Sequence, residues 1–204
     1  MTRLALLGAS GHGKVVADIA ELLGWDEVVF FDDAWPGLNN NGPWPVVGDS
    51  QRLYDKLASY DGVLVSIGNN SIRANKLSKL INLHARIISL CHPTACISRY
   101  ADFGLGSVVM ASAVVNAGVS SGIGGIFNTG CTVDHDCIIG DYVHVSPGAH
   151  LAGGVKIGTR SWVGIGSCVR QEITLGCDVV VGAGAAVIKD IPDNVVVKGV
   201  PAKV

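Results

Sequence analysis

The 204-residue chain has few aromatic side chains and few charged ones. Aromatic residues make up 6% of the sequence and charged residues 16%, and the formal net charge is only -2. Proteins that bind nucleic acid through its phosphates carry an excess of Lys and Arg, so this charge balance predicts no nucleic-acid partner. Hydrophobic residues make up 49% of the chain, which is enough to bury a sizeable core.

Long hydrophobic runs and paired cysteines are also missing. No apolar run approaches the roughly 20 residues that a membrane-spanning helix needs. The first residues, MTRLALLGASGHGK, reach glycine and histidine after a short apolar stretch that is too brief for a signal-peptide core. We therefore expect a soluble, cytoplasmic protein without membrane insertion. The six cysteines form no C-x-x-C pair, so we interpret them as small buried hydrophobes in a reducing compartment.

Residues 1–90 alternate between strand-like and helix-like patterns. Strands are predicted over residues 4–8, 27–31, 62–68 and 86–90, and helices over residues 13–24, 48–59 and 71–84. In the first helix, the apolar face is predicted to consist of Val15, Val16, Ile19, Leu22 and Leu23. This alternation predicts a Rossmann-like α/β domain with a small parallel sheet, whose ligands bind beyond the carboxyl ends of the strands.

The segment GASGHGK follows the first predicted strand and opens the first helix. Its glycines do not match the dinucleotide motif G-x-G-x-x-G, but glycines at a helix N-terminus favour an anion such as a phosphate. Asp32 and Asp33 end the second strand and could accept hydrogen bonds from a ribose. The alternatives are a solvated turn for the two aspartates and a loop or capping role for His12.

Residues 91–204 follow a period of six. Every position in this series except Ser121 is Ile, Leu, Val or Phe, and the residue four positions further on is small or aliphatic. Such a period is the signature of a parallel β-helix built from hexapeptide repeats. The series consists of Ile97, Phe103, Val109, Val115, Ser121, Phe127, Val133, Ile139, Val145, Leu151, Ile157, Val163, Val169, Leu175, Val181 and Val187.

This C-terminal segment resembles the hexapeptide-repeat acyltransferases. The resemblance implies a left-handed β-helix with three hexapeptides in each coil, and a homotrimer. Residues 18 apart then stack on successive coils, which places Gly153 beside His135. His144 is nine residues beyond His135, half a coil away, so one subunit cannot easily bring both side chains to one reacting centre. We therefore expect active sites between subunits.

A more specific resemblance rests on the segments GASGHGK, FFDD, SIGNNSIR, HPTA, VDHDCIIGD, HVSPGAHLAG and GVPAK. Together they resemble the family of sugar O- and N-acetyltransferases that includes sialic acid O-acetyltransferases and nucleotide-4-aminosugar N-acetyltransferases. The resemblance is strongest to enzymes that acetylate the 4-amine of a UDP-linked 2-acetamido-4-amino-2,4,6-trideoxy sugar. It implies that residues 1–90 bind the nucleotide sugar through Gly11, His12 and Gly13 at the diphosphate, Asp32 and Asp33 at the uridine, and Gly68 and Asn69 nearby.

The same resemblance implies the residues that carry the chemistry. His135 would be the general base and Asp136 its carboxylate helper, although Asp134 is a competing candidate for that helper. A histidine suits the base because its unperturbed pKa lies near neutral pH. We choose the backbone N–H of Gly153 as the donor that stabilises the tetrahedral oxyanion.

The acyl donor implied by the resemblance is acetyl-CoA. His144 would contact its thioester end, and Ile165 and Ala183, which are 18 residues apart, would lie along its pantetheine arm. A metal site in the segment VDHDCIIGD is disfavoured, because Cys131 and Cys137 take the inward small-residue position and His135 does not.

Other functions remain open on the sequence. One is acetylation of another nucleotide-linked 4-amino sugar, such as GDP-perosamine, and another is O-acetylation of a sialic acid. A third, from a different class, is a non-catalytic trimeric scaffold that binds nucleotide sugars.

Overall fold

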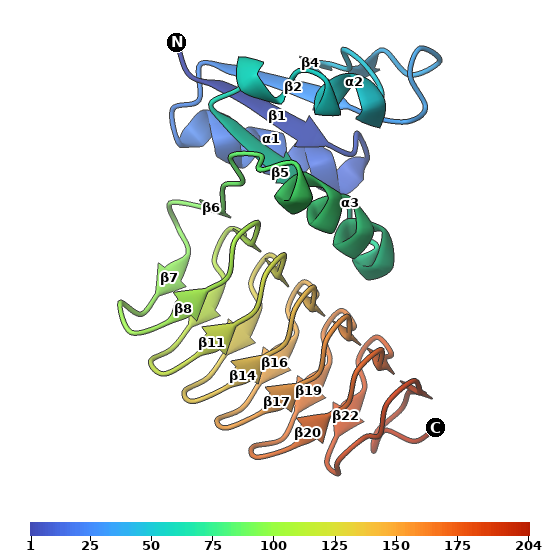
Figure 1. Ribbon diagram of the computed structural model, residues 1–204. Helices are drawn as coiled ribbons and strands as arrows, with labels where there is room; N and C mark the ends of the chain where they lie inside the picture. Colours follow the sequence, from blue (N-terminus) through green and yellow to red (C-terminus); the bar gives the residue numbers. More distant parts are fainter. The chain divides into compact units, whose positions relative to one another are not determined.

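The computed structural model describes residues 1–204, which divide into two compact units. The N-terminal unit comprises Met1–Leu90 and the β-helix unit comprises Cys91–Val204. Their element order matches the expected fold class, an α/β unit followed by a left-handed parallel β-helix, and this prediction is confirmed (Figure 1). No helix is both long enough and apolar enough to cross a membrane.

A three-stranded parallel sheet forms the centre of the N-terminal unit, with the strand order β2-β1-β5. Nearly every strand residue is buried, as expected for a parallel sheet with both faces covered. The elements are β1 (Arg3–Leu7), α1 (Gly11–Leu22), β2 (Glu27–Phe31), the hairpin of β3 (Asn40–Asn41) and β4 (Trp44–Pro45), α2 (Ser50–Tyr54), the 3-10 helix η1 (Leu57–Ser59), β5 (Gly62–Val65) and α3 (Asn70–Asn82).

The buried face of α1 differs from the predicted one. Val16 and Ile19 are buried, but Val15, Leu22 and Leu23 are exposed, so the predicted face was wrong at three positions. The helix instead packs through small residues, since a Cβ atom at Gly13 would lie 2.5 Å from the carbonyl oxygen of Gly8. Small residues spaced three and four apart allow the helix to approach the sheet closely.

One further segment departs from its prediction. The predicted strand over residues 86–90 is reduced to a single bridge between Val63 and Ile87, because Leu90 already belongs to β6 (Leu90–Cys91). The segment WPGLNNNGPWP contains the β3–β4 hairpin, in which the buried Asn41 donates a hydrogen bond to the carbonyl oxygen of Ser10 over 3.1 Å. The hairpin thereby supports the glycine loop between β1 and α1.

Three parallel sheets form the β-helix unit, and each of their strands is two residues long. Paired strands are offset by 18 residues, as in the pair of Thr132 with His150, except that Val180 pairs with Val196 in the last coil. The first sheet contains β7 (Cys96–Ile97), β10 (Val114–Val115), β13 (Thr132–Val133), β16 (His150–Leu151), β19 (Cys168–Val169) and β22 (Ala186–Val187). The second contains β8 (Asp102–Phe103), β11 (Ser120–Ser121), β14 (Ile138–Ile139), β17 (Lys156–Ile157) and β20 (Thr174–Leu175). The third contains β6, β9 (Val108–Val109), β12 (Ile126–Phe127), β15 (His144–Val145), β18 (Trp162–Val163), β21 (Val180–Val181) and β23 (Val196–Val197).

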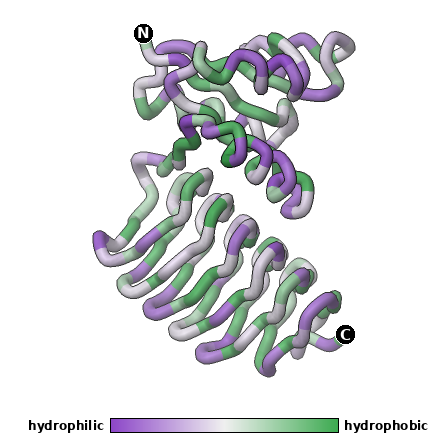
Figure 2. Tube along the Cα trace, viewed as in Figure 1, coloured by the Kyte–Doolittle hydropathy of each residue, from purple (hydrophilic) through white to green (hydrophobic).

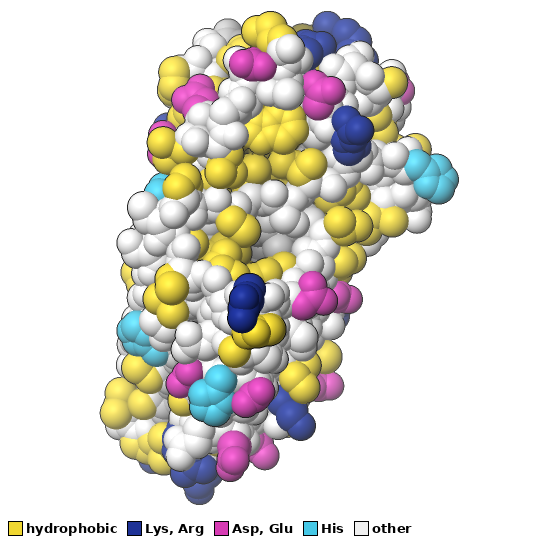
Figure 3. Space-filling model, turned by 90° about the vertical axis from the view of Figure 1, so that its left-hand side faces the viewer, with side chains coloured by type: hydrophobic (Ala, Val, Ile, Leu, Met, Phe, Trp, Pro, Cys, Tyr) yellow, Lys and Arg dark blue, Asp and Glu magenta, His cyan; other side chains and the backbone are white.

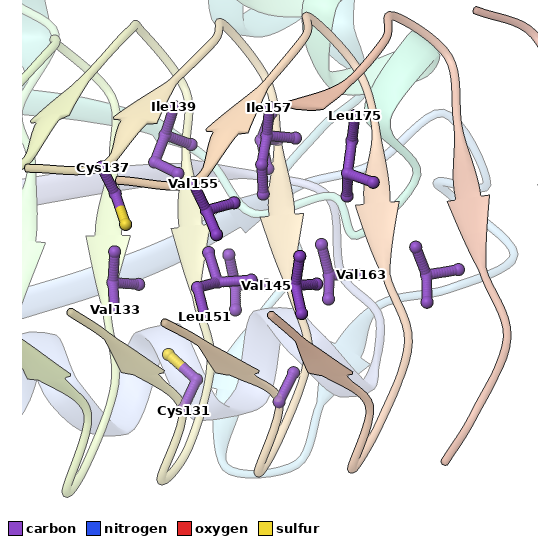
Figure 4. Close-up of a cluster of buried hydrophobic side chains, with 14 of the residues drawn as sticks. Cys131, Val133, Cys137, Ile139, Val145, Leu151, Val155, Ile157, Val163 and Leu175 are labelled. Carbon is purple, nitrogen blue, oxygen red and sulfur yellow. The ribbon is translucent and has the colours of Figure 1, made fainter. Parts of the chain in front are cut away.

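The second residue of nearly every β-helix strand belongs to the six-residue series and points inward (Figure 4). All members of the series are buried except Ile97, Phe103 and Ser121, which are half-buried. Hydrophobic and hydrophilic stretches accordingly alternate along each coil (Figure 2). The inward residues form one continuous core along the β-helix, which is why a period of six specifies this fold.

The cysteines follow this register only in part. Cys131 and Cys137 are buried in the core, as predicted. Cys91, Cys96 and Cys168 are exposed, so their interpretation as buried hydrophobes was wrong. Cys96 and Cys168 are the first residues of their strands, whose side chains point away from the core, whereas Cys91 ends β6 at the first coil.

Candidate functional site

His135 lies in the turn after β13, between two aspartates. Its Nδ1 is 2.8 Å from Oδ2 of Asp136, and both side chains are largely exposed. Asp134 contacts the backbone instead, because its Oδ1 accepts hydrogen bonds from the His135 N–H and from Nδ2 of Asn116, each over 2.8 Å. Asp136 is therefore the carboxylate that meets the ring.

The corner geometry of the coil places Asp136 beside the ring. Its backbone adopts a left-handed conformation with φ 59°, at a coil corner that Gly154 and Glu172 repeat on the next two coils. Asp is among the non-glycine residues that tolerate this conformation best. On the preceding coil Gly118 leaves room for the carboxylate, since a Cβ atom there would lie 2.5 Å from Oδ1 of Asp136.

The two aspartates determine the protonation of His135. The hydrogen bond that His135 donates to Asp136, and next the charge of Asp134, raise the pKa of His135 above its ordinary value of 6.5. A carboxylate can only accept, so the proton shared with Asp136 resides on Nδ1. The neutral ring therefore carries its lone pair on Nε2, which is the form that a general base requires.

Gly153 lies against the other edge of the same ring. A Cβ atom at this position would lie 2.6 Å from both Cε1 and Nε2 of His135, so only glycine leaves the ring in place. The N–H groups of Ala152 and Gly154 donate to backbone carbonyls, but the N–H of Gly153 makes no hydrogen bond within the chain. A donor without an internal partner thus lies beside the candidate base.

These groups line a cavity of about 470 Å³, which we call the His135 pocket. It is lined by Asp134, His135, Asp136, Ala152, Gly153, Gly154, Gln171 and Glu172. The structure therefore brings His135, Asp136 and Gly153 together, as the stacking rule predicts. In the lower part of Figure 3, a histidine side chain lies directly beside an acidic side chain.

His144 lines a second cavity, of about 380 Å³, which we call the His144 pocket. Its ring is buried and stacks on Trp162, with ring centroids 5.0 Å apart and an interplanar angle of 14°. Trp162 is itself fixed, because its Nε1 donates to Oγ of Ser146 over 2.6 Å. The pocket is lined by His144, Ser146, Pro147, Trp162, Gly164, Ile165, Val180, Val181, Gly182 and Ala183.

The structure groups the predicted acyl-donor residues His144, Ile165 and Ala183 as expected. His144, Ile165 and Ala183 line one pocket, whereas Gly153 lies in the other with His135. His135 and His144 thus line two different pockets. This separation agrees with the expectation that one subunit cannot bring the two histidines to a single centre.

The N-terminus of α1 differs from those of the other two α-helices. Asn69 caps α3 and Asp49 caps α2, each accepting a backbone hydrogen bond, but Ser10 at the start of α1 makes no side-chain cap. The first turn of α1 also holds no acidic residue. The positive end of this helix dipole is therefore not neutralised by the chain itself.

Gly11 and His12 form this first turn, so both lie at the start of the helix, as the sequence predicts. Burial, and next the charge of Arg73, lower the pKa of His12 to about 4, so its ring is neutral at pH 7. Gly11 is exposed and has open space around it. Gly13 is buried against the sheet, so packing alone explains the glycine there.

A third cavity, of about 220 Å³, lies at the carboxyl ends of the strands in the N-terminal unit. We call it the Asp33 pocket, and it is lined by Leu7, Gly8, Ser10, Asp32, Asp33, Ser50, Ile67, Ile72 and Lys76. Nζ of Lys76 donates to Oδ2 of Asp33 over 2.6 Å and to Oγ of Ser50 over 2.7 Å. Burial alone would raise the pKa of Asp33, but the hydrogen bonds from Lys76 and Ser50 and the Lys76 charge lower it to about 2.

The other predicted nucleotide-binding residues have structural partners. The carboxylate of Asp32 accepts hydrogen bonds from the N–H groups of Ala9 and Ala34, over 2.8 and 2.9 Å, so it fixes the glycine loop against β2. The carbonyl oxygen of Gly68 accepts a hydrogen bond from Arg73 over 3.0 Å. Asn69 uses its side-chain oxygen to cap α3.

Sequence reasoning missed several residues of these pockets. Trp162 and Asn116 lie 18 residues from His144 and Asp134, so the stacking rule that placed Gly153 could have found both. Lys76 and Ser50 reach Asp33 from distant segments, and no local pattern signals that contact. No group of three or more His, Cys, Asp or Glu side chains is arranged to hold a metal ion.

Comparison with known proteins identifies relatives along the whole chain. Residues 3–80 match the family model described as the PglD N-terminal domain. The chain is 30% identical to GDP-perosamine N-acetyltransferase of Escherichia coli O157:H7, over 100% of this chain and 96% of that protein.

Two solved structures are similar to this chain over nearly their full length. The acetyltransferase domain of PglB from Neisseria gonorrhoeae FA1090, in complex with acetyl coenzyme A, is 45% identical with a TM-score of 0.94 over 98% of each chain. PerB from Caulobacter crescentus, in complex with CoA and GDP-perosamine, is 36% identical with a TM-score of 0.88, over 100% of this chain and 97% of that one. This chain therefore belongs to the hexapeptide-repeat family of acetyl-CoA-dependent sugar N-acetyltransferases.

Proposed function

We propose that this enzyme acetylates the 4-amine of a UDP-linked 2-acetamido-4-amino-2,4,6-trideoxy sugar, which gives UDP-N,N'-diacetylbacillosamine. The observation that carries the acetyl-transfer step is the pairing of His135 with Asp136 beside the N–H of Gly153. The choice of UDP comes from the sequence resemblance, and the nucleotide site is assigned to the N-terminal unit.

The proposed reaction is a direct transfer without a covalent enzyme intermediate. The lone pair of the sugar amine attacks the thioester carbonyl, and Nε2 of His135 takes the proton that the nitrogen loses. The N–H of Gly153 donates to the oxyanion of the tetrahedral intermediate. When the C–S bond breaks, the imidazolium returns its proton to the departing CoA thiolate, so the products are the amide and free CoA. Asp136 stabilises the imidazolium between these steps.

The N-terminal unit supplies features that suit a nucleoside diphosphate. The uncapped N-terminus of α1 offers backbone N–H groups and positive potential to phosphate oxygens. The adjacent Asp33 pocket presents a carboxylate, an ammonium group and a hydroxyl group. Together these groups can form hydrogen bonds with the nucleobase or the ribose of the nucleotide. Gly11, His12 and Gly13 are proposed to contact the diphosphate and sugar, and Gly68 and Asn69 to lie nearby.

A GDP-linked 4-amino sugar is the second candidate substrate. It is favoured by the relatives whose names include GDP-perosamine, which match this chain over its full length at 30% and 36% identity. The acetyltransferase domain of PglB is more similar, at 45% identity. Both candidates share the amine that His135 is proposed to deprotonate.

A substrate comparison tests the proposal. The release of CoA is followed with a thiol reagent while acetyl-CoA is combined with the UDP-linked 4-amino sugar, with GDP-perosamine or with a free sialic acid. We expect the highest kcat/KM with the UDP-linked sugar. A higher kcat/KM with GDP-perosamine would identify the GDP-linked sugar as the substrate in place of the UDP-linked one. Turnover of sialic acid alone would overturn the proposal of N-acetylation.

We also propose that the enzyme is a homotrimer in which the His135 pocket of one subunit meets the His144 pocket of its neighbour. The support is that the two pockets lie apart on one chain although both are needed for the transfer. A mixing experiment tests this arrangement with two inactive variants, His135→Ala and Ala183→Trp, the second of which blocks the His144 pocket.

After the two variants are unfolded and refolded together, random assembly should restore about one quarter of the wild-type activity, because each shared site then has the required pair with that probability. Refolding each variant alone is the control. If the mixture stays as inactive as its components, each subunit holds a complete site and the proposed arrangement is wrong.

A further inference from the structure

We propose that Lys76 makes the Asp33 pocket selective for a uracil base over guanine. Lys76 lies on α3, and its ammonium group contacts Asp33, which follows β2, and Ser50, which begins α2. The inference rests on the proposed function where it places the nucleotide in the N-terminal unit. It adds the residue that chooses the base and the hydrogen bonds by which it does so.

Asp33 already accepts three hydrogen bonds from the chain itself. Its Oδ1 accepts from the N–H of Ser50 over 3.0 Å, and its Oδ2 accepts from Nζ of Lys76 over 2.6 Å. The hydroxyl group of Ser50 donates to the same carboxylate, while its oxygen accepts from Lys76 over 2.7 Å. A carboxylate has about four lone-pair sites, so about one remains for a ligand.

The remaining lone-pair site can only accept a hydrogen bond. Burial alone would raise the pKa of Asp33, but the hydrogen bonds from Lys76 and Ser50 and the Lys76 charge lower it to about 2. The carboxylate is therefore ionised at neutral pH and carries no proton to donate. Its side chain is 60% exposed, so a ligand in the pocket can reach it.

Lys76 adds one hydrogen-bond donor beside this acceptor. An ammonium group carries three N–H bonds, and two of those on Lys76 point to Asp33 and Ser50. The Lys76 side chain is 24% exposed and lines the pocket, so the third N–H can point to a ligand. The pocket therefore offers one donor next to one acceptor site.

The other polar side chains of the pocket are committed elsewhere. Asp32 accepts from the N–H groups of Ala9 and Ala34 over 2.8 and 2.9 Å, so turning its carboxylate toward a base would release the glycine loop. Ser10 lies at the N-terminus of α1, where the diphosphate is proposed to bind. The recognition of the base therefore falls to Lys76 and Asp33.

A uracil edge matches one donor and one acceptor. Its O4 can accept from Lys76 while the adjacent N3–H donates to Asp33. Guanine presents the same pair as O6 and N1–H, but its 2-amino group lies next to N1–H and needs a further acceptor. In uracil the corresponding group is an oxygen, which has no proton to place. Because Lys76 and Ser50 occupy the rest of the carboxylate, guanine would bind with an unsatisfied donor, which lowers its affinity.

The binding of UDP and GDP to the full chain, measured by calorimetry without acetyl-CoA, tests the inference. Lys76→Met keeps the length of the side chain but removes the donor and frees a lone-pair site on Asp33. We expect the wild type to bind UDP about 10-fold more tightly than GDP, and the variant to lose this preference. Lys79→Met, at an exposed position on the same helix, is the matched control and should keep it.

The ratio of the two affinities is the deciding quantity, because the loss of a positive charge weakens the binding of both diphosphates alike. A wild type that prefers GDP or binds neither nucleotide would overturn the inference, and these results require no variant. An unchanged ratio in Lys76→Met would also overturn it, even if the UDP-linked sugar is acetylated. If the preference for UDP depends on Lys76 but no acetyl group reaches the UDP-linked 4-amino sugar, the proposed function fails while the role of Lys76 stands.

Discussion

The imidazole of His135 lies in the space that a side chain at position 153 would occupy. Its Cε1 and Nε2 atoms are each 2.6 Å from the place of a Cβ atom on Gly153. The absence of a side chain on one coil thus sets the position of the candidate base on the coil before it.

Gly153→Ala should therefore displace His135 and impair catalysis without unfolding the β-helix. We expect kcat to fall by roughly 100-fold, because a displacement of about 1 Å at a reacting group can cost this much. The measurement is steady-state kinetics together with circular dichroism. The double variant His135→Ala/Gly153→Ala serves as the control, and it should be no slower than His135→Ala alone; additive losses would show that Gly153 acts elsewhere.

Asp136→Asn should change the pH dependence of the enzyme. The base must be deprotonated, so activity rises as pH passes the His135 pKa, which the Asp136 hydrogen bond raises above 6.5. Removing that hydrogen bond should lower the pH midpoint of kcat/KM and also reduce its plateau. The profile of each variant is compared with the wild type, so that the titration of the substrate amine, which is common to both, does not enter the difference.

Asp134→Asn is the matched comparison for this prediction. It removes the secondary electrostatic contribution to the His135 pKa but leaves the bond between Nδ1 and Asp136 in place. Its pH midpoint should fall less than that of Asp136→Asn, and its plateau should remain higher. The reverse order would make Asp134 the functional partner of the base.

Substitution of Ser10 should separate helix stability from anion binding. Ser10 makes no side-chain cap, so Ser10→Asp and Ser10→Asn should each stabilise α1, by about 1 kcal/mol. Only Ser10→Asp adds a negative charge at the proposed diphosphate site, and we expect it to raise the KM for the nucleotide sugar by roughly 5- to 10-fold. Equal KM values for the two variants would place the diphosphate elsewhere.

Neutral His12 should make the N-terminal unit sensitive to acid. The pKa of His12 is lowered to about 4, chiefly by burial, whereas an unfolded histidine titrates near 6.5. Between these values the unfolded state binds more protons, so stability falls as pH falls, by roughly 2 kcal/mol from pH 7 to pH 5. Urea unfolding at both pH values, for the wild type and for His12→Gln, measures this effect; an equal loss in both proteins would exclude His12 as its source.

The β-helix could be predicted from the sequence because each repeat contains the hydrophobic residue that identifies its inward strand position. The hydrophobic series marks the inward strand position directly, and the 18-residue offset then places Gly153 beside His135. The same rule places Trp162 over His144. Local periodicity and one geometric constant are sufficient for these relationships.

Local periodicity was not sufficient to predict the packing of the N-terminal unit. The apolar pattern of α1 included Leu22 and Leu23, but the helix buries Gly13 and its alanines because the close approach to the sheet depends on small side chains. The contact of Lys76 with Asp33 joins segments that are far apart in the sequence. Neither feature has a local signal, since each depends on the packing of complete elements.

The most direct test of the account is the turnover of His135→Ala with acetyl-CoA and the UDP-linked 4-amino sugar, measured by CoA release. Loss of a general base should lower kcat by roughly 10²- to 10⁴-fold, and the variant should keep the circular dichroism spectrum and oligomeric state of the wild type. Turnover near the wild-type rate would contradict the assignment of His135 as the base.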